Sequence, residues 1–189
     1  MTRNSAGAPS VQEGQSPVSG LEIDVMREAG EWPGQAEEWV RRAAEHAYVV
    51  AGPAEEAELC IVLADDPFVR NLNKTYRGKD KPTNVLSFPV ADMPAAAGGE
   101  PIWAGDGRMT LLGDVVLAQE TVAGEAEAQG KSFADHLSHL VVHGILHLLG
   151  HDHEVDAEAD EMEALERDIL EDLGIADPYR SERARGHDV

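Results

Sequence analysis

Apolar positions in the first half of the chain follow two different periods. Residues 21–25 alternate apolar and polar side chains, which predicts a strand with one buried face. Residues 39–48 carry apolar side chains at helical spacing, and a Gly-Pro pair ends this pattern. A second strand is predicted over 58–64. An acidic cap at Asp65, with a proline in the first turn, then predicts the start of another helix.

The second half of the chain predicts two more strands and three more helices. These are strands 84–89 and 111–118 and helices 119–129, 132–149 and 156–173. Ser132 and Asp135 form a capping pair at the start of one helix. The Ala-, Gly- and Pro-rich residues 91–110 are either a surface insertion or a functional flap. The pattern predicts an α/β (α+β) fold, with a mixed sheet of about four strands packed with about five helices.

We expect one domain over residues 21–175, because neither an internal repeat nor a second block of hydrophobic periodicity is present. Residues 1–20 are dominated by Gly, Pro and Ser, which predicts a flexible tail. Residues 176–189 are predicted to be a second flexible tail.

Composition narrows the functional classes. The chain has 36 acidic and 15 basic residues, a formal charge of -21, which opposes non-specific binding to nucleic acid or to anionic membranes. Its 42% hydrophobic content excludes wholesale disorder. Cys60 is the single cysteine, so no intramolecular disulfide can form. Without a signal peptide or an apolar run of about 20 residues, we expect a cytoplasmic protein that does not enter the membrane.

The chemistry concentrates in residues 143–153. His143 and His147 are four residues apart on a helix, so both side chains can reach one ion at about 2.0–2.1 Å. Gly150 follows where a helix commonly ends in a left-handed residue, and the chain can then reverse. That reversal brings His153 toward the ion as a third ligand and leaves a position for water, as in catalytic zinc sites.

Alternatives to this zinc site remain open. Each histidine alone fits an amphipathic helix in which hydrogen bonds satisfy it, although five of the eight histidines fall between residues 139 and 153. His151 could replace His153 as the third ligand. His136 and His139 share the helical face with the ligands and are expected to support them or to be solvated. Nickel, copper or iron could replace zinc.

The spacing His-x-x-x-His-x-x-Gly-x-x-His also occurs in zinc metalloproteases of the metzincin type. Those enzymes place a glutamate directly after the first histidine, where it acts as general base. Gly144 occupies this position here. Asp152 or Glu154 could substitute, so a metalloprotease-like hydrolase stays as an alternative.

Three blocks of sequence resemble the YbeY-type endoribonucleases, which are also described as ribosomal RNA maturation factors. The blocks are residues 143–153, residues 72–89 and the Gly-Asp-containing residues 112–118. The resemblance runs from about residue 21 to residue 173. His151 departs from it, because family members often have tyrosine there, and the 91–110 loop is longer than usual.

The resemblance implies a zinc-dependent, single-strand-specific endoribonuclease with a zincin-like metal-site helix. It would act in 16S rRNA 3'-end maturation and ribosome quality control, with single-stranded RNA and the small ribosomal subunit as partners. One Zn²⁺ per chain would be held by His143, His147 and His153, and the family's functional arginine corresponds to Arg77. The general base and partner proteins are not implied, and either water or the RNA 2'-hydroxyl could attack.

Basic residues cluster around this arginine. Five of the fifteen fall within twelve positions, opposed only by Asp80. They are Arg70, Lys74, Arg77, Lys79 and Lys81. We expect Arg77 to stabilise charge on the phosphate during cleavage and the other four to bind the RNA backbone. The alternative is a solvated helix end without a ligand.

A third hypothesis is a ribosome-assembly binding factor with a structural metal and little nuclease activity. The charge of -21 and the missing glutamate keep it open. Removing a ligand would then unfold the protein, because structural zinc contributes to the free energy of folding.

Overall fold

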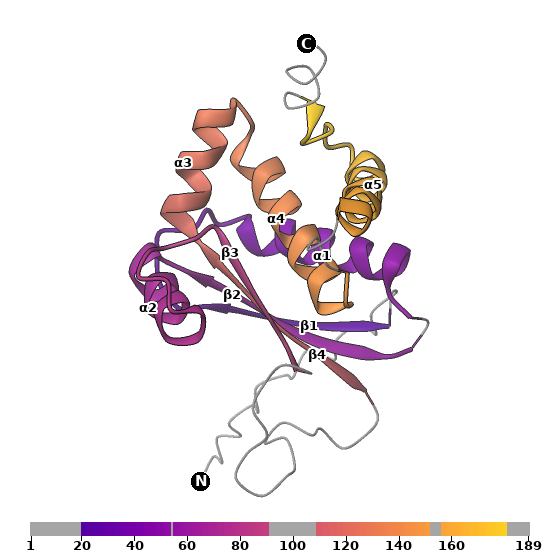
Figure 1. Cartoon of the computed structure of the whole chain (residues 1–189), viewed down its shortest axis with the longest axis horizontal. Coiled ribbons are helices and arrows are strands. Elements are labelled where there is room, and N and C mark those ends of the chain that lie inside the picture. Colours follow the sequence, from indigo (N-terminus) through magenta and orange to yellow (C-terminus); the bar gives the residue numbers. More distant parts are fainter. Residues whose placement is uncertain (1–19, 54, 91–108, 152–155, 181–189) are drawn as a thin grey trace, which may run out of the picture.

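A computed structural model describes residues 20–53, 55–90, 109–151 and 156–180 of the chain. A four-stranded sheet forms its centre, and five helices surround it (Figure 1). Among the described residues, no helix combines the length and apolar character that crossing a membrane requires.

The sheet is mixed, with the strand order β1-β2-β4-β3. Its strands are β1 (Leu21–Arg27), β2 (Ala57–Ala64), β4 (Thr110–Ala118) and β3 (Val85–Pro89). Strands β1, β2 and β4 are parallel, whereas β3 pairs with β4 in the antiparallel direction. Strand β3 therefore lies at an edge of the sheet, beside β4.

Helices cover the two faces unequally (Figure 1). On one face lie α1 (Ala36–Ala51) and α4 (Phe133–Leu148), and α5 (Asp156–Asp172) packs on both of them. The other face carries α2 (Asp66–Arg77). Helix α3 (Gln119–Gln129) contacts both α4 and α2. The candidate metal helix and the candidate catalytic arginine thus belong to opposite faces.

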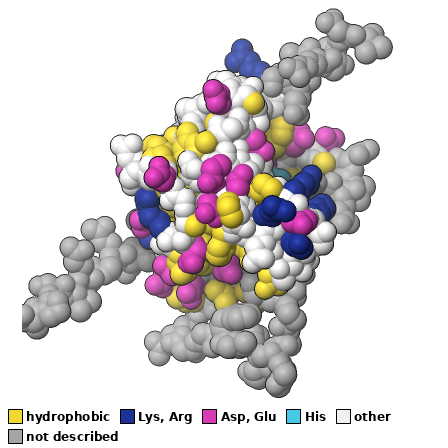
Figure 2. All heavy atoms as spheres, turned by 90° about the vertical axis from the view of Figure 1, so that its left-hand side faces the viewer, with side chains coloured by type: hydrophobic (Ala, Val, Ile, Leu, Met, Phe, Trp, Pro, Cys, Tyr) yellow, Lys and Arg dark blue, Asp and Glu magenta, His cyan; other side chains and the backbone are white. Residues whose placement is uncertain are grey.

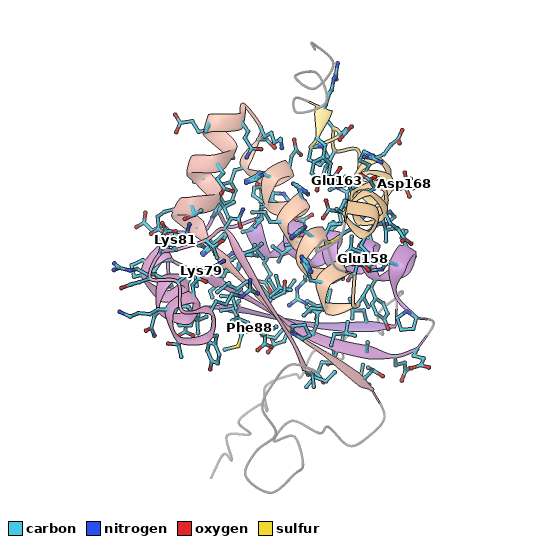
Figure 3. The ribbon with its side chains drawn as sticks, viewed as in Figure 1. Lys79, Lys81, Phe88, Glu158, Glu163 and Asp168 are labelled. Atoms are coloured by element: carbon cyan, nitrogen blue, oxygen red, sulfur yellow. The ribbon has the colours of Figure 1, made fainter. Side chains whose placement is uncertain are left out.

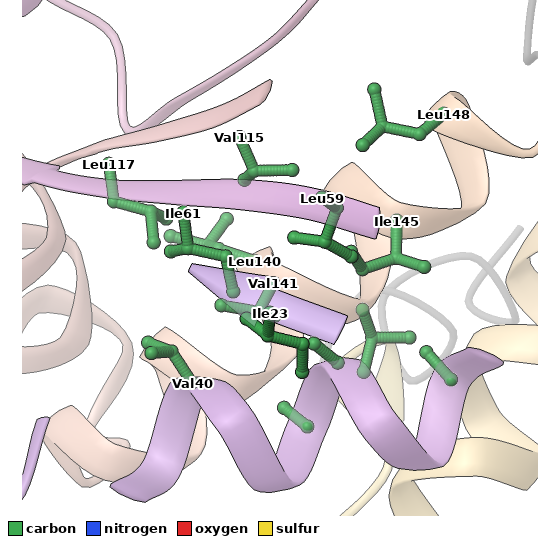
Figure 4. Close-up of a cluster of buried hydrophobic side chains, with 14 of the residues drawn as sticks. Ile23, Val40, Leu59, Ile61, Val115, Leu117, Leu140, Val141, Ile145 and Leu148 are labelled. Carbon is green, nitrogen blue, oxygen red and sulfur yellow. The ribbon is translucent and has the colours of Figure 1, made fainter. Parts of the chain in front are cut away.

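The period-two alternation of the strands forms two hydrophobic clusters. Leu59, Ile61 and Leu63 of β2 face α1 and α4, together with Val115 and Leu117 of β4. Figure 4 shows most of these side chains packed against the helices. The intervening residues of β2 and β4 face α2 in the second cluster, which contains Val62, Ala64, Val116 and Ala118. The face of β2 toward α1 and α4 is buried, whereas the face toward α2 is buried at Ala64 and half-buried at Cys60 and Val62.

The predicted fold class is confirmed, with four strands in a mixed sheet and five helices. Two predicted caps are present: Asp65 accepts a hydrogen bond from the Phe68 amide at 2.9 Å, and Ser132 accepts one from the Asp135 amide at 3.0 Å. Most of the predicted loop at 91–110 and of both predicted tails lies outside the described residues. Residues 176–180, which we assigned to the C-terminal tail, are described and include the buried Pro178.

Candidate functional site

Helix α4 brings His143 and His147 together. Their rings meet edge to face with centroids 4.6 Å apart, and the two Nε2 atoms are 3.1 Å apart. Two nitrogens that bind one tetrahedral zinc at about 2.0–2.1 Å would be about 3.3 Å apart. The geometry of the pair therefore fits a shared metal ion.

The described residues place no third candidate ligand with His143 and His147. Within the described residues, no group of three His, Cys, Asp or Glu side chains is arranged to hold a metal. His151, the alternative third ligand, does not join His143 and His147 in such a group. His153 lies outside the described residues, so its assignment as the third ligand remains a prediction.

Gly150 ends α4 in the left-handed conformation that its position predicted, and the predicted reversal beyond it lies outside the described residues. Gly150 has a φ of +91°, a conformation that side chains other than glycine rarely adopt. The Gly150 amide donates to the His147 carbonyl at 3.1 Å, and the His151 amide donates to the Leu146 carbonyl at 3.0 Å. These bonds satisfy carbonyls at the end of the helix.

Glu166 of α5 is a buried carboxylate beside His143 and His147, which we call the metal pair because they are the candidate ligands of one ion. Sequence reasoning missed this glutamate. Its Oε1 lies 2.7 Å from Nδ1 of His143, and its Oε2 lies 3.3 Å from Nε2 of His139. Burial alone would raise the pKa of Glu166, but hydrogen bonds from the two histidines lower it to about 2. Its sequence position could have revealed it, because Glu166 lies at helical spacing among the apolar residues Met162, Ile169 and Leu170. A glutamate on such a buried stripe is expected to have a specific partner, because charged residues are rarely buried without one.

His136 is neither solvated nor directed at Glu166. It is buried, and its Nε2 lies 2.8 Å from Oε2 of Glu125 on α3. The same carboxylate oxygen accepts a hydrogen bond from Asn84 at 2.9 Å. Burial lowers the pKa of His136, and the neighbouring Glu125 partly opposes that shift. The histidines of α4 therefore contact two different helices. His136 forms a hydrogen bond with α3, whereas His139 and His143 form hydrogen bonds with α5.

Arg77 is connected to α4 through the edge strand. Its Nη2 donates to the Ser87 carbonyl of β3 at 3.3 Å. The Ser87 hydroxyl in turn donates to the Gly144 carbonyl at 3.3 Å, directly beside His143. One strand residue thus separates the arginine at the end of α2 from the helix that carries the metal pair.

Gly144 packs tightly against the sheet. A Cβ atom at this position would lie 2.9 Å from Cγ1 of Val115 and 3.2 Å from Oγ of Ser87. The position that holds the general base in metzincin-type proteases therefore faces β3 and β4 and has no room for a glutamate side chain. Asp152 and Glu154, the carboxylates that could substitute for this glutamate, lie outside the described residues.

Fewer cations of the basic cluster are available to RNA than the sequence implied. Asp80 accepts from Arg70 Nε at 2.7 Å and from Lys74 Nζ at 3.0 Å. These hydrogen bonds lower the pKa of Asp80, so its charge opposes those two cations. Figure 2 shows basic side chains gathered around an acidic one on this face. Lys79 and Lys81 are exposed and form no ion pair with a described acidic side chain.

Two of the exposed lysines lie far from the acidic side chains that Figure 3 labels on α5. Lys79 and Lys81 lie between α2 and β3, whereas Glu158, Glu163 and Asp168 lie on α5 (Figure 3). The predicted roles of Arg70, Lys74, Lys79 and Lys81 in binding RNA remain predictions.

Tyr76, beside Arg77, is a second residue that sequence reasoning left without a role. Its side chain is 64% exposed, and its ring meets that of Phe88 edge to face at 5.4 Å. Tyr76 contacts β3 one residue beyond the Arg77 contact with Ser87. An exposed aromatic ring beside a cation is suited to stacking on an unpaired base.

The Cys60 thiol and the Asp114 carboxyl, on the α2 side of the sheet, both have raised pKa values. Burial, with a further contribution from Asp114, raises the pKa of the Cys60 thiol to about 11. Burial also raises the pKa of Asp114, in the Gly-Asp block of β4. Cys60 and Asp114 are register partners on β2 and β4, and both point away from α4, so neither belongs to the metal pair.

Comparisons with known proteins agree on one family. The family described as Endoribonuclease YbeY matches residues 23–174. A protein named Endoribonuclease YbeY from Parvibaculum lavamentivorans is 68% identical over 165 residues, which cover 87% of this chain and 88% of the relative. A protein of the same name from a Chelativorans species is 46% identical over 172 residues, covering 88% and 98%.

A solved structure shows the same fold. The solution structure of a Thermotoga maritima protein superposes with a TM-score of 0.54 at 24% sequence identity. The match covers 86% of this chain and 93% of the other.

Proposed function

The chain belongs to the YbeY family of endoribonucleases, and we propose that it cuts single-stranded RNA with one zinc ion bound at α4. The approach of the His143 and His147 Nε2 atoms to 3.1 Å supports this proposal, because two nitrogens that share one zinc ion would lie about 3.3 Å apart. His153 supplies the third ligand in the proposed site. A bound zinc would polarise a phosphodiester oxygen and make water a stronger acid.

Arg77 is the proposed catalytic residue. Its guanidinium is anchored to the Ser87 carbonyl through Nη2, which leaves its other donors to bind a phosphate. A planar guanidinium can donate two hydrogen bonds to one phosphate. It would stabilise the charge that develops on the phosphate during cleavage, whether water or the 2'-hydroxyl attacks.

Selectivity for single strands is supported by the neighbourhood of Arg77. The exposed ring of Tyr76 can stack only on a base that is not enclosed in a duplex. Lys79 and Lys81 add positive charge on the same side, while the overall charge of -21 repels the RNA backbone elsewhere. The RNA would therefore cross the edge strand β3 between α2 and α4.

The proposed cellular role is maturation of the 16S rRNA 3' end and ribosome quality control on the small subunit in the cytoplasm. Family membership supports this role. Incubation with small subunits that carry 3'-extended 16S rRNA should produce the mature end. Accumulation of uncut precursor with active enzyme would overturn the role in maturation and leave the nuclease activity standing.

Endonuclease activity on a labelled single-stranded RNA tests the proposed chemistry. The zinc-loaded protein should cut, whereas His147→Ala and Arg77→Ala should not. Two matched variants on α1, His46→Ala and Arg42→Ala, should cut like the parent protein. All five proteins are purified identically, which exposes a contaminating ribonuclease, since contamination would make every sample active.

The circular dichroism of His147→Ala separates the remaining alternatives. A folded, metal-free and inactive variant supports a catalytic metal, because a catalytic site can lose its ion without unfolding. An unfolded variant, together with an inactive parent protein, would instead favour a ribosome-assembly factor with a structural metal.

A further inference from the structure

Glu166 is the one carboxylate that the hydrophobic core encloses completely among the described residues, with 0% of its surface exposed. An isolated buried carboxylate is strongly unfavourable, so its position must be supported by specific partners. Its neighbours on α5 at helical spacing are Met162, Ile169 and Leu170, which pack into the core. The carboxylate emerges from this apolar stripe toward α4.

Both carboxylate oxygens of Glu166 are used. Oε1 faces Nδ1 of His143 at 2.7 Å, and Oε2 faces Nε2 of His139 at 3.3 Å. The hydroxyl of Tyr179 also donates to Oε2. Tyr179 packs edge to face on the His139 ring at 5.7 Å, so the same side chain contacts two members of this network.

The contact with Glu166 selects one form of the His143 ring. An ionised carboxylate only accepts hydrogen bonds, so Nδ1 of His143 must carry the proton. In a neutral imidazole the other nitrogen, Nε2, then carries no proton and can act as a metal ligand. That Nε2 is the atom 3.1 Å from Nε2 of His147, where the metal is proposed to bind.

Tyr179 is held in place by the segment that contains it. Its amide donates to Asp177 Oδ1 at 2.8 Å, and Lys131 donates to the neighbouring Pro178 carbonyl at 3.2 Å. The hydroxyl contacts Oε2 of Glu166, whereas His143 contacts Oε1. Glu166 is therefore fixed between a histidine of α4 and a tyrosine thirteen residues further along the chain.

We propose that Glu166, oriented by Tyr179, is a positioning residue that holds His143 with its Nε2 lone pair directed at the metal. The inference rests on the proposed function, because it requires a metal at His143 and His147. It assigns no direct contact with RNA to Glu166. It also gives the C-terminal residues 176–180 a part in the site.

Zinc affinity, measured by competition with a coloured chelator, tests this role without any activity assay. Glu166→Gln should bind zinc about 10- to 100-fold more weakly, the usual effect of losing a partner that orients a ligand. The glutamine amide nitrogen can donate to Nδ1, which permits the opposite ring form with a proton on Nε2. Tyr179→Phe keeps the ring and should weaken binding several-fold. Glu158→Gln, an exposed position on the same helix (Figure 3), should bind like the parent protein.

Nitrogen NMR of the imidazole rings adds a readout that a purely structural role would not change. In the metal-free parent protein, His143 should carry its proton on Nδ1, and Glu166→Gln should increase the Nε2-protonated form. If Glu166→Gln does not fold, Tyr179→Phe decides the question by the same two measurements. Unchanged zinc affinity and ring form in a folded variant would overturn the inference. Absence of zinc binding by the parent protein would instead overturn the proposed function.

Discussion

Arg77 and His143 lie 66 positions apart in the sequence, and a single serine connects them. The Ser87 carbonyl accepts from Arg77, and the Ser87 hydroxyl donates to the Gly144 carbonyl. The arginine is therefore held by backbone oxygen rather than by an acidic side chain among the described residues. Its charge remains available to a phosphate.

Replacing Arg77 by lysine tests the need for the planar guanidinium. We expect Arg77→Lys to lower kcat at least about 100-fold, because an ammonium group keeps the charge but cannot bind phosphate in the same two-point geometry. Zinc content should stay at one ion per chain. The measurement is kcat at saturating single-stranded RNA, with Arg42→Lys on α1 as the matched control. A fully active Arg77→Lys would show that charge alone is sufficient.

Residue spacing alone predicted candidate site residues only where they are close together in the chain, and Arg77 was assigned through the family resemblance. His143 and His147 share a helix, so their spacing determines their approach. Glu166 and Tyr179 come from α5 and the segment after it, and their contacts depend on how α5 packs on α4. The pairing of Arg70 and Lys74 with Asp80 depends on the turn that follows α2, and no charge count could predict it.

At the scale of elements, the close packing of α4 on β3 and β4 sets the position of the metal pair. Gly144 permits this contact, because a Cβ atom there would lie 2.9 Å from Cγ1 of Val115. Val115 is fully buried in the core, so it cannot move without disturbing its neighbours. A methyl group at residue 144 would push α4 away from the strand that anchors Arg77.

Two glycine-to-alanine substitutions should change stability in opposite directions. Overpacking costs about 1–3 kcal/mol, and the better helix propensity of alanine returns about 1 kcal/mol, so Gly144→Ala should lower the free energy of unfolding by about 1 kcal/mol. Gly124→Ala in α3 has open space around the new Cβ and should raise it by about 0.5–1 kcal/mol. Urea unfolding of the metal-free proteins measures both. Equal stabilisation would contradict the tight packing of α4.

The contact between α2 and β3 predicts a role for the exposed aromatic ring beside Arg77. Tyr76→Ala should raise KM for single-stranded RNA roughly tenfold with little change in kcat, because stacking on a base contributes about 1–3 kcal/mol. Tyr76→Phe keeps the ring and should retain the parent KM. The experiment is a steady-state titration with a short oligonucleotide. An unchanged KM for Tyr76→Ala would exclude stacking at this position.

The elements themselves were predictable, but their arrangement was not. Period-two and helical patterns located four strands and five helices, because each buries one face or stripe on a local repeat. The sheet order β1-β2-β4-β3 and the antiparallel direction of β3 depend on contacts between distant segments. The position of Arg77 beside α4 follows from that order, so the sequence could not supply it.

At the scale of the whole molecule, net charge and local charge act in opposite directions. A chain with a formal charge of -21 repels RNA over most of its surface. Of the basic cluster, Arg77, Lys79 and Lys81 have no described acidic partner, whereas Asp80 pairs with Arg70 and Lys74. Binding should therefore depend on few cations and be specific in position.

The salt dependence of RNA binding should report the small number of cations that contact phosphate. Three phosphate contacts predict a slope of about -2 in a plot of log affinity against log salt concentration, at about -0.7 for each contact with a single strand. The double variant Lys79→Gln/Lys81→Gln should reduce the slope to about -0.7. Asp80→Asn should release Arg70 and Lys74, strengthen binding and steepen the slope. Fluorescence anisotropy of a labelled oligonucleotide measures all three proteins, and identical slopes would contradict the assignment.

Burial raises the pKa of the Cys60 thiol, which lowers its reactivity toward thiol reagents, because the thiolate is the reactive form. A cysteine introduced on the exposed surface of α2 would thus react with a maleimide dye much faster than Cys60, so Cys60 need not be replaced. Such a dye would report the approach of an RNA strand to β3 directly, on a protein whose sheet had not been altered.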